Sequence, residues 1–89
     1  MNIAVFDARV RRDDGRDMRF DVIVRDQSAE RARELVLAHG RRYLEAKGVS
    51  PDALSAEQCR FCHAAIASPA VEAEIERIGF AIIEWKNCD

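Results

Sequence analysis

The stretch that decides the fold runs from Ile3 to Val24, IAVFDARVRRDDGRDMRFDVIV. Apolar and polar residues alternate on both sides of a turn, which is the pattern of two β-strands. A two-residue turn at Asp14-Gly15 would pair Phe6 with Ile23 and mix the two faces. A three-residue loop over residues 13–15 keeps each face uniform and needs Gly15 in the left-handed conformation. The predicted apolar face then holds the pairs Ala4 with Val24, Phe6 with Val22, Ala8 with Phe20 and Val10 with Met18.

The opposite face of this hairpin is charged at one end and apolar at the other. Asp7 is expected opposite Asp21, and Arg9 opposite Arg19, with unlike charges on the diagonals. Paired carboxylates can bind a cation, but alternating charge is typical of a solvated sheet face. The other end carries the apolar patch Ile3, Val5 and Ile23. Such a patch needs a cover, and a loop or a second subunit would provide it.

Two helices and two further strands are predicted after the hairpin. The first helix is expected from an N-cap at Ser28 to about Lys47, ending at Gly48. The second begins at the cap Ser68 with Pro69 in its first turn, and ends at Gly79. A short strand is expected between them, and residues 80–85 form the last strand. We therefore predict one α+β domain over residues 1–89, of order β-β-α-β-α-β, with a four-stranded sheet and both helices packed on one face.

The core face of the first helix is assigned from its periodicity. Residues at 3-4-3 spacing form one stripe, which comprises Ala32, Leu35, Val36, His39, Tyr43 and Ala46. Within this stripe His39 is expected to be a packed histidine rather than a ligand or base. Leu37 and Leu44 lie beside the stripe, where they either extend the core face or form an oligomer contact.

Composition and charge narrow the classes of function. The chain has 89 residues and a net charge of −2, and its basic residues are dispersed, which argues against nucleic-acid binding. No export signal or membrane span is recognisable. An odd number of cysteines, three, favours reduced thiols in such a chain. We therefore expect a cytoplasmic protein.

The segment Cys59-Arg60-Phe61-Cys62-His63 is the one motif with chemical potential. Together with Cys88 it supplies a Cys₃His set that could bind zinc. As a strand, the segment would turn Cys59, Phe61 and His63 one way and Cys62 the other. As a helical turn capped by Ser55 and Gln58, it would place both cysteines and His63 on one face.

The motif has three other interpretations, two of which stay open. The pair Cys59-x-x-Cys62 could be a thiol redox site, although the next helix cap, Ser68, lies too far along for a thioredoxin-like arrangement. Covalent haem attachment belongs to exported proteins and does not fit. The cysteines could also be core residues, which is the interpretation that we favour, because free cysteines are among the most buried residues.

The chain resembles a known bacterial family, the domain of unknown function numbered two thousand and twenty-four. The resemblance spans nearly the whole chain and is carried by residues 3–7, 18–22, 55–63 and 79–83, with Cys88 near the end. Its most specific part is the string Cys59 to His63. The resemblance implies a compact α+β fold and no activity.

No catalytic arrangement is visible in the sequence. We interpret the chain as a small non-catalytic cytoplasmic interaction domain that forms a homodimer through Ile3, Val5 and Ile23 or through Leu37 and Leu44. The alternatives are a zinc-binding module that uses Cys59, Cys62, Cys88 and His63, and a thiol redox protein.

Overall fold

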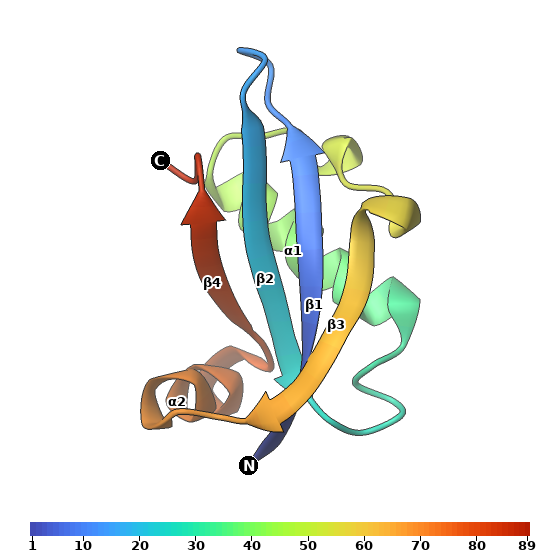
Figure 1. The fold of residues 1–89 in the computed structure, drawn as a ribbon, viewed down its shortest axis with the longest axis vertical. Coiled ribbons are helices and arrows are strands. Elements are labelled where there is room, and N and C mark those ends of the chain that lie inside the picture. Colours follow the sequence, from blue (N-terminus) through green and yellow to red (C-terminus); the bar gives the residue numbers. More distant parts are fainter.

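Four strands and two α-helices make up the computed structural model, which describes residues 1–89 (Figure 1). The strands are β1 (Asn2–Arg11), β2 (Asp17–Arg25), β3 (Cys59–Ile66) and β4 (Ala81–Lys86), and the helices are α1 (Arg33–Ala46) and α2 (Pro69–Ile78). Two short 3₁₀ helices, η1 (Pro51–Ala53) and η2 (Ala56–Gln58), lie between α1 and β3. The predicted α+β class and the order β-β-α-β-α-β are confirmed.

The hairpin of β1 and β2 has the predicted register. Phe6 lies opposite Val22, and Val10 lies opposite Met18. The Gly15 N–H donates to the Arg12 carbonyl over 2.9 Å, and Gly15 has a φ of +85°. Only glycine adopts this conformation without strain, so the three-residue loop depends on it. All neighbouring strands are antiparallel in the order β3-β1-β2-β4, so the hairpin is the centre of the sheet and β3 and β4 are its edges.

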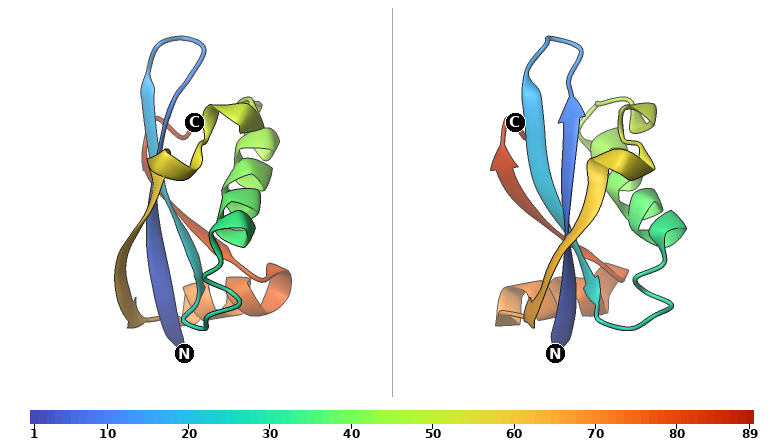
Figure 2. Two further views of the ribbon diagram at one scale, coloured as in Figure 1. Left: turned by 90° about the vertical axis from the view of Figure 1, so that its right-hand side faces the viewer. Right: turned by 45° about the vertical axis from the view of Figure 1, so that its right-hand side comes forward.

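The two helices lie on opposite faces of the sheet. Helix α1 stands behind the strands in Figure 1 and to one side of them in Figure 2. It packs with the predicted apolar face of the hairpin in a cluster of 16 buried residues. Helix α2 packs on the other face, where its fully buried Ile75 joins Ile3, Val5, Ile23 and Ala81 in a second, smaller cluster.

The prediction that both helices share one face is therefore wrong for α2. The reason lies in the connection, because α2 links the end of β3 at one edge of the sheet to the start of β4 at the other edge. Helix α2 therefore crosses the end of the sheet over Ile3, Val5 and Ile23, and it buries this apolar patch of the second face. These three residues are at most 5% exposed, so they do not provide a dimer surface.

Helix α1 begins at Arg33 instead of after Ser28. Residues 27–31 form one turn, in which the Arg31 N–H donates to the Gln27 carbonyl over 2.9 Å, and the extended Ala32 interrupts it. Helices in proteins are stabilised mainly by packing. The segment after β2 must first cross to the helix layer, as Figure 1 shows, and only then can a helix pack.

The buried stripe of α1 also differs from the predicted one. Its buried residues are Val36, Leu37, Gly40 and Leu44, whereas Leu35 is 38% exposed. Leu37 and Leu44 therefore belong to the core and are not an oligomer contact. The stripe is shifted because Gly40 faces the sheet. A Cβ at Gly40 would lie 2.6 Å from Cδ2 of the fully buried Leu54, so the missing side chain lets Leu54 fit between helix and sheet.

Helix α2 begins and ends as predicted, and the last strand lies one residue later than the predicted residues 80–85. The Ser68 side chain accepts a hydrogen bond from the Val71 N–H, Pro69 starts α2, and Gly79 ends it with a φ of +91°. No helix has the length and apolar character needed to cross a membrane.

Candidate functional site

The cysteine motif lies on β3, one of the two edge strands. Before it, Ser55 and Gln58 form the predicted capping box, but this box caps only the short helix η2, which ends at Gln58. Cys59 is then the first residue of β3 and pairs with Ala8 of β1. The motif is therefore a strand and not the helical turn that would have gathered its cysteines and histidine.

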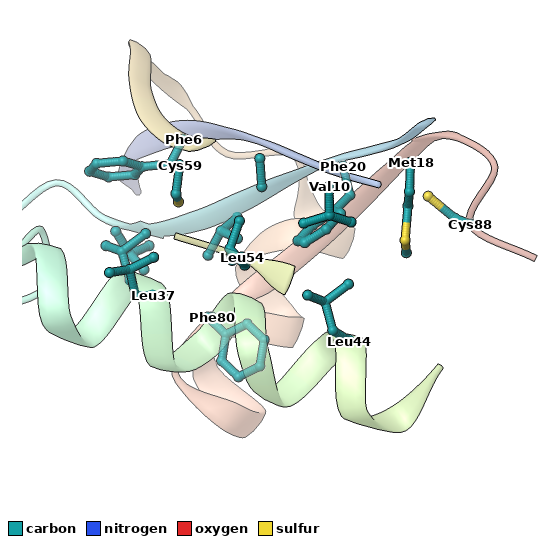
Figure 3. Packing of buried hydrophobic residues seen from close by; sticks show 14 of the residues in the cluster. Phe6, Val10, Met18, Phe20, Leu37, Leu44, Leu54, Cys59, Phe80 and Cys88 are labelled. Atoms are coloured by element: carbon teal, nitrogen blue, oxygen red, sulfur yellow. The ribbon is translucent and has the colours of Figure 1, made fainter. Parts of the chain in front are cut away.

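Cys59 lies in the core beneath α1. It is 7% exposed, and Figure 3 shows it beside Phe6 at the end of the core where Leu37 lies. Burial raises the pKa of the Cys59 thiol to about 11, because the charged thiolate loses its hydration there. The nearby Asp7 carboxylate raises this pKa as well, so Cys59 is a neutral thiol at pH 7.

A β-bulge at Cys62 places the residues before and after it on different faces of the sheet, whereas simple alternation predicts the same face. Phe61 pairs with Phe6 and His63 pairs with Val5, which leaves Cys62 as an extra residue without a partner. His63 therefore lies on the α2 face instead of sharing a face with Cys59 and Phe61, as simple alternation predicts. Cys62 is exposed, and its Sγ lies 3.2 Å from Nδ1 of His63.

Cys88 lies at the opposite end of the core from Cys59. Figure 3 shows it beside Met18, and its thiol donates to the Arg19 carbonyl over 3.2 Å. Of the four proposed zinc ligands, only Cys62 and His63 are in contact. No three side chains of the types His, Cys, Asp and Glu are grouped as metal ligands.

The structure instead places the first three residues of the motif, Cys59 to Phe61, on the wall of a cavity. The cavity has a volume of about 460 Å³ and lies between the first two turns of α1, η2 and the start of β3. Its lining contains six apolar residues, Phe6, Val36, Leu37, Ala56, Cys59 and Phe61. Four charged residues complete the lining, Arg31, Arg33, Glu57 and Arg60.

Phe61 is the most exposed apolar residue of this cavity. The Phe61 side chain is 47% exposed, and its ring meets that of Phe6 edge to face with centroids 5.6 Å apart. The Arg31 guanidinium lies over the Phe61 ring at 4.4 Å from its centroid. Such a cation–π contact orients both groups. The cavity therefore combines an aromatic wall with fixed positive charge.

The family model described as "Domain of unknown function (DUF2024)" matches residues 1–85 of the chain. The chain belongs to this family. The resemblance drawn from the sequence is thus confirmed. Its most specific part, the string Cys59 to His63, contributes its first three residues to the cavity wall.

A solved structure is similar to this DUF2024 chain over its full length. It is the NMR structure of protein NE1680 from Nitrosomonas europaea, which is 31% identical, has a TM-score of 0.82 and is matched over 100% of both chains. No curated protein matches the chain.

Other charged and polar positions in this DUF2024 domain behave largely as expected. Asp7 accepts hydrogen bonds from Nε of Arg9 on its own strand and of Arg19, its diagonal neighbour on β2, at 3.0 Å each. The contact with Arg19 confirms one of the two predicted diagonals, whereas Asp21 is buried and accepts a hydrogen bond from Trp85. His39 stacks on Phe80 with centroids 4.3 Å apart, and its Nε2 is buried without a partner. Burial lowers the pKa of His39, which fits a packed histidine.

Sequence reasoning missed the arginines of the cavity. Arg31 and Arg33 were expected to lie within a helix that starts at Ser28, but the break at Ala32 turns them toward Phe61 and the wall. The signal in the sequence was the pair Arg31-x-Arg33. Together with Arg60 of the motif, it places three cations in the two segments that meet at this cavity.

Proposed function

We propose that this protein is a non-catalytic binding domain of the cytoplasm, which takes up an amphipathic anion in the cavity between α1 and β3. The ligand class is an apolar ring system or chain that carries a carboxylate, sulfonate or phosphate group. The observation that carries this proposal is the lining, because six apolar residues meet three arginines and a single carboxylate there. A volume of about 460 Å³ is within the range of small-molecule sites.

The apolar wall supports uptake of a ring or chain. Phe61 keeps 47% of its surface exposed, although it packs edge to face on the buried Phe6. Exposed aromatic surface at the mouth of a cavity is favourable for a ligand, since each Å² of apolar area removed from water contributes roughly 25 cal/mol. Leu37 and Val36 of α1 continue this wall into the core.

The three arginines support recognition of a negative charge. Arg31 is paired with Asp26 through one Nη, and Arg60 donates through its Nε to the Glu57 carbonyl. A guanidinium carries five N–H donors, so both keep donors for a ligand. Arg33 forms no ion pair, and the planar guanidinium suits bidentate contact with a carboxylate or phosphate.

The chemistry of the lining supports binding without catalysis. Cys59 is the one thiol in the wall, and its pKa of about 11 keeps it protonated at neutral pH. A neutral thiol is a poor nucleophile.

The test uses 1-anilinonaphthalene-8-sulfonate, a fluorescent aromatic anion. We expect saturable binding of one dye per chain to the native protein, and displacement by 1-naphthoate but not by the uncharged 1-naphthalenemethanol. Phe61→Ala should weaken binding roughly tenfold, because loss of about 1.4 kcal/mol of apolar contact corresponds to that factor. Phe61→Leu should retain most of the affinity.

The matched control is Ile66→Ala. Ile66 is on the same strand and is 74% exposed, so it is the most exposed large apolar residue, yet it lies outside the cavity. Its replacement should leave dye binding unchanged. An equal loss of binding in Ile66→Ala and Phe61→Ala, or displacement by the alcohol as readily as by the acid, contradicts the proposal.

A further inference from the structure

The α2 face of the sheet is covered at only one end. Figure 1 shows α2 beside the end of the sheet near the N-terminus, with no helix in front of the half that leads to the hairpin turn. On this open half the apolar residues of the other end give way to charged ones. Asp7, Arg9, Arg19 and Asp21 alternate along the paired strands β1 and β2.

A second cavity, of about 490 Å³, lies on this open half and shares no lining residue with the α1 cavity. Its lining contains four cationic side chains, Arg9, Arg11, Arg19 and Lys86, against the single carboxylate of Asp17. The whole chain, by contrast, has a net charge of −2. Asp7, which pairs with Arg9 and Arg19 beside the cavity, brings the local balance to four cations against two carboxylates. This local excess of positive charge attracts and orients anions.

The ion pairs of these arginines leave donors free. Arg9 and Arg19 each contact Asp7 through Nε at 3.0 Å, and Arg11 contacts Asp17 through Nε at 2.9 Å. In each guanidinium the two terminal amino groups remain outside the pair. The side chains of Arg9, Arg11 and Arg19 are 66%, 71% and 46% exposed. The carboxylates therefore fix the arginines in place without consuming the donors that a ligand needs.

An exposed tryptophan lies at the rim of this cationic group. The Trp85 ring is 59% exposed, and its indole N–H donates over 2.8 Å to Asp21, which is itself only 8% exposed. The Arg19 guanidinium lies 5.8 Å from the Trp85 ring centroid. The ring is thus anchored at one edge and offers a flat surface next to the arginines. Aromatic surfaces of this kind stack nucleobases.

We propose that the open half of the sheet binds a linear polyphosphate, either free or as the triphosphate group of a nucleotide. The phosphate oxygens accept hydrogen bonds from the free guanidinium groups of Arg9, Arg11 and Arg19 and from the ammonium group of Lys86. In a nucleotide the base stacks on Trp85. This site is on the face opposite the α1 cavity and is independent of the function proposed for that cavity.

The experiment uses the fluorescence of Trp85, the only tryptophan of the chain, in titrations with sodium tripolyphosphate and with ATP. We expect saturable binding of both, weaker at higher salt, and several-fold tighter for ATP. Calorimetry repeats each titration without relying on the tryptophan signal. In calorimetry, Trp85→Leu should lower the affinity for ATP to that for tripolyphosphate and leave the latter unchanged, which separates the base from the phosphates.

The charge requirement is tested with the double variant Arg11→Gln, Lys86→Gln. It should lose at least tenfold in affinity for both probes, because two charge-assisted contacts to the phosphate oxygens are removed. Arg77→Gln is the control, since Arg77 is an equally exposed arginine on α2 paired with Glu74. Circular dichroism verifies that each variant is folded.

Three results would overturn the proposal. The first is the absence of saturable binding of either probe at 1 mM by both methods. The second is an equal loss of affinity in Arg77→Gln. The third is binding of a ten-residue oligodeoxythymidine at least tenfold more tightly than ATP, which would make the surface a single-strand binding site.

Discussion

Replacing Leu44 and Leu35 of α1 by alanine tests which stripe of the helix forms the core. Leu44 is fully buried in the larger cluster, whereas Leu35 is 38% exposed and belongs to neither cluster. Both changes remove the same three carbon atoms from the same helix, so helix propensity cancels in the comparison. The difference in the free energy of unfolding between the two variants therefore reports packing alone.

The magnitudes follow from burial. Leu→Ala at a fully buried site costs about 2–5 kcal/mol, and for Leu44, which packs between helix and sheet, we expect about 3 kcal/mol. For Leu35 we expect less than about 1 kcal/mol. In a domain of this size 1 kcal/mol lowers Tm by about 4–8 °C, so Leu44→Ala should lower it by about 12 °C or more.

The assay is urea unfolding at 25 °C followed by far-ultraviolet circular dichroism. With a slope of about 1.5 kcal/mol/M, the midpoint of Leu44→Ala should fall by about 2 M, and that of Leu35→Ala by less than about 0.7 M. If Leu35→Ala is as destabilising as Leu44→Ala, the stripe through Ala32, Leu35 and His39 forms the core and the packing described here is wrong.

Three further predictions concern the second core, the thiols and pH. Ile75→Ala should cost about 2–4 kcal/mol in urea unfolding, because it empties the centre of the small cluster under α2; a cost below about 1 kcal/mol would contradict that cover. Iodoacetamide at pH 7 should modify Cys62 quickly and Cys59 slowly, with the rate at Cys59 rising as the pH approaches its pKa of about 11, and mass spectrometry of peptides distinguishes them; equal rates would exclude the buried position of Cys59. Since the folded state lowers the pKa of His39, its stabilising effect is complete above the ordinary pKa of about 6.5 and is lost as the pH falls toward the lowered value. The free energy of unfolding of the wild type should therefore fall more than that of His39→Phe between pH 7 and pH 5. An equal fall in the two proteins would contradict this assignment.

The hairpin could be predicted to the residue because its sequence offers only one consistent register. A shift of one position would turn Phe6 and Val22 to opposite faces, so alternation and turn length had to agree. The ends of α2 could be predicted for a similar reason, since Ser68, Pro69 and Gly79 act through local backbone geometry.

The stripe of α1 could not be predicted because two apolar phases overlap on this helix. Counting apolar residues favours the phase of Leu35 and His39, and Gly40 adds nothing to that count. In the structure Gly40 decides the phase, because its lack of a side chain admits Leu54. The contact joins residues from separate segments, so no local pattern reveals it.

The candidate cavity could be predicted only in part. The motif identified Cys59 and Phe61, but the bulge at Cys62 that turns His63 to the other face leaves no trace in local propensity. The patch of Ile3, Val5 and Ile23 correctly indicated that something covers the second face. Its cover is α2 and not a second subunit, a choice set by the path of the chain between the two edge strands.

The unpaired residue in β3 can be regarded as an insertion that the ladder tolerates. Phe61 and His63 already face consecutive residues of β1, so a chain lacking Cys62 would retain every partner and every side-chain direction. Such a chain would have a straight, regular outer border with Ile66 protruding from it, which is the kind of border that recruits further strands and grows into aggregates. The bulge at Cys62 thus disfavours pairing of this edge strand with the sheet of a neighbouring molecule.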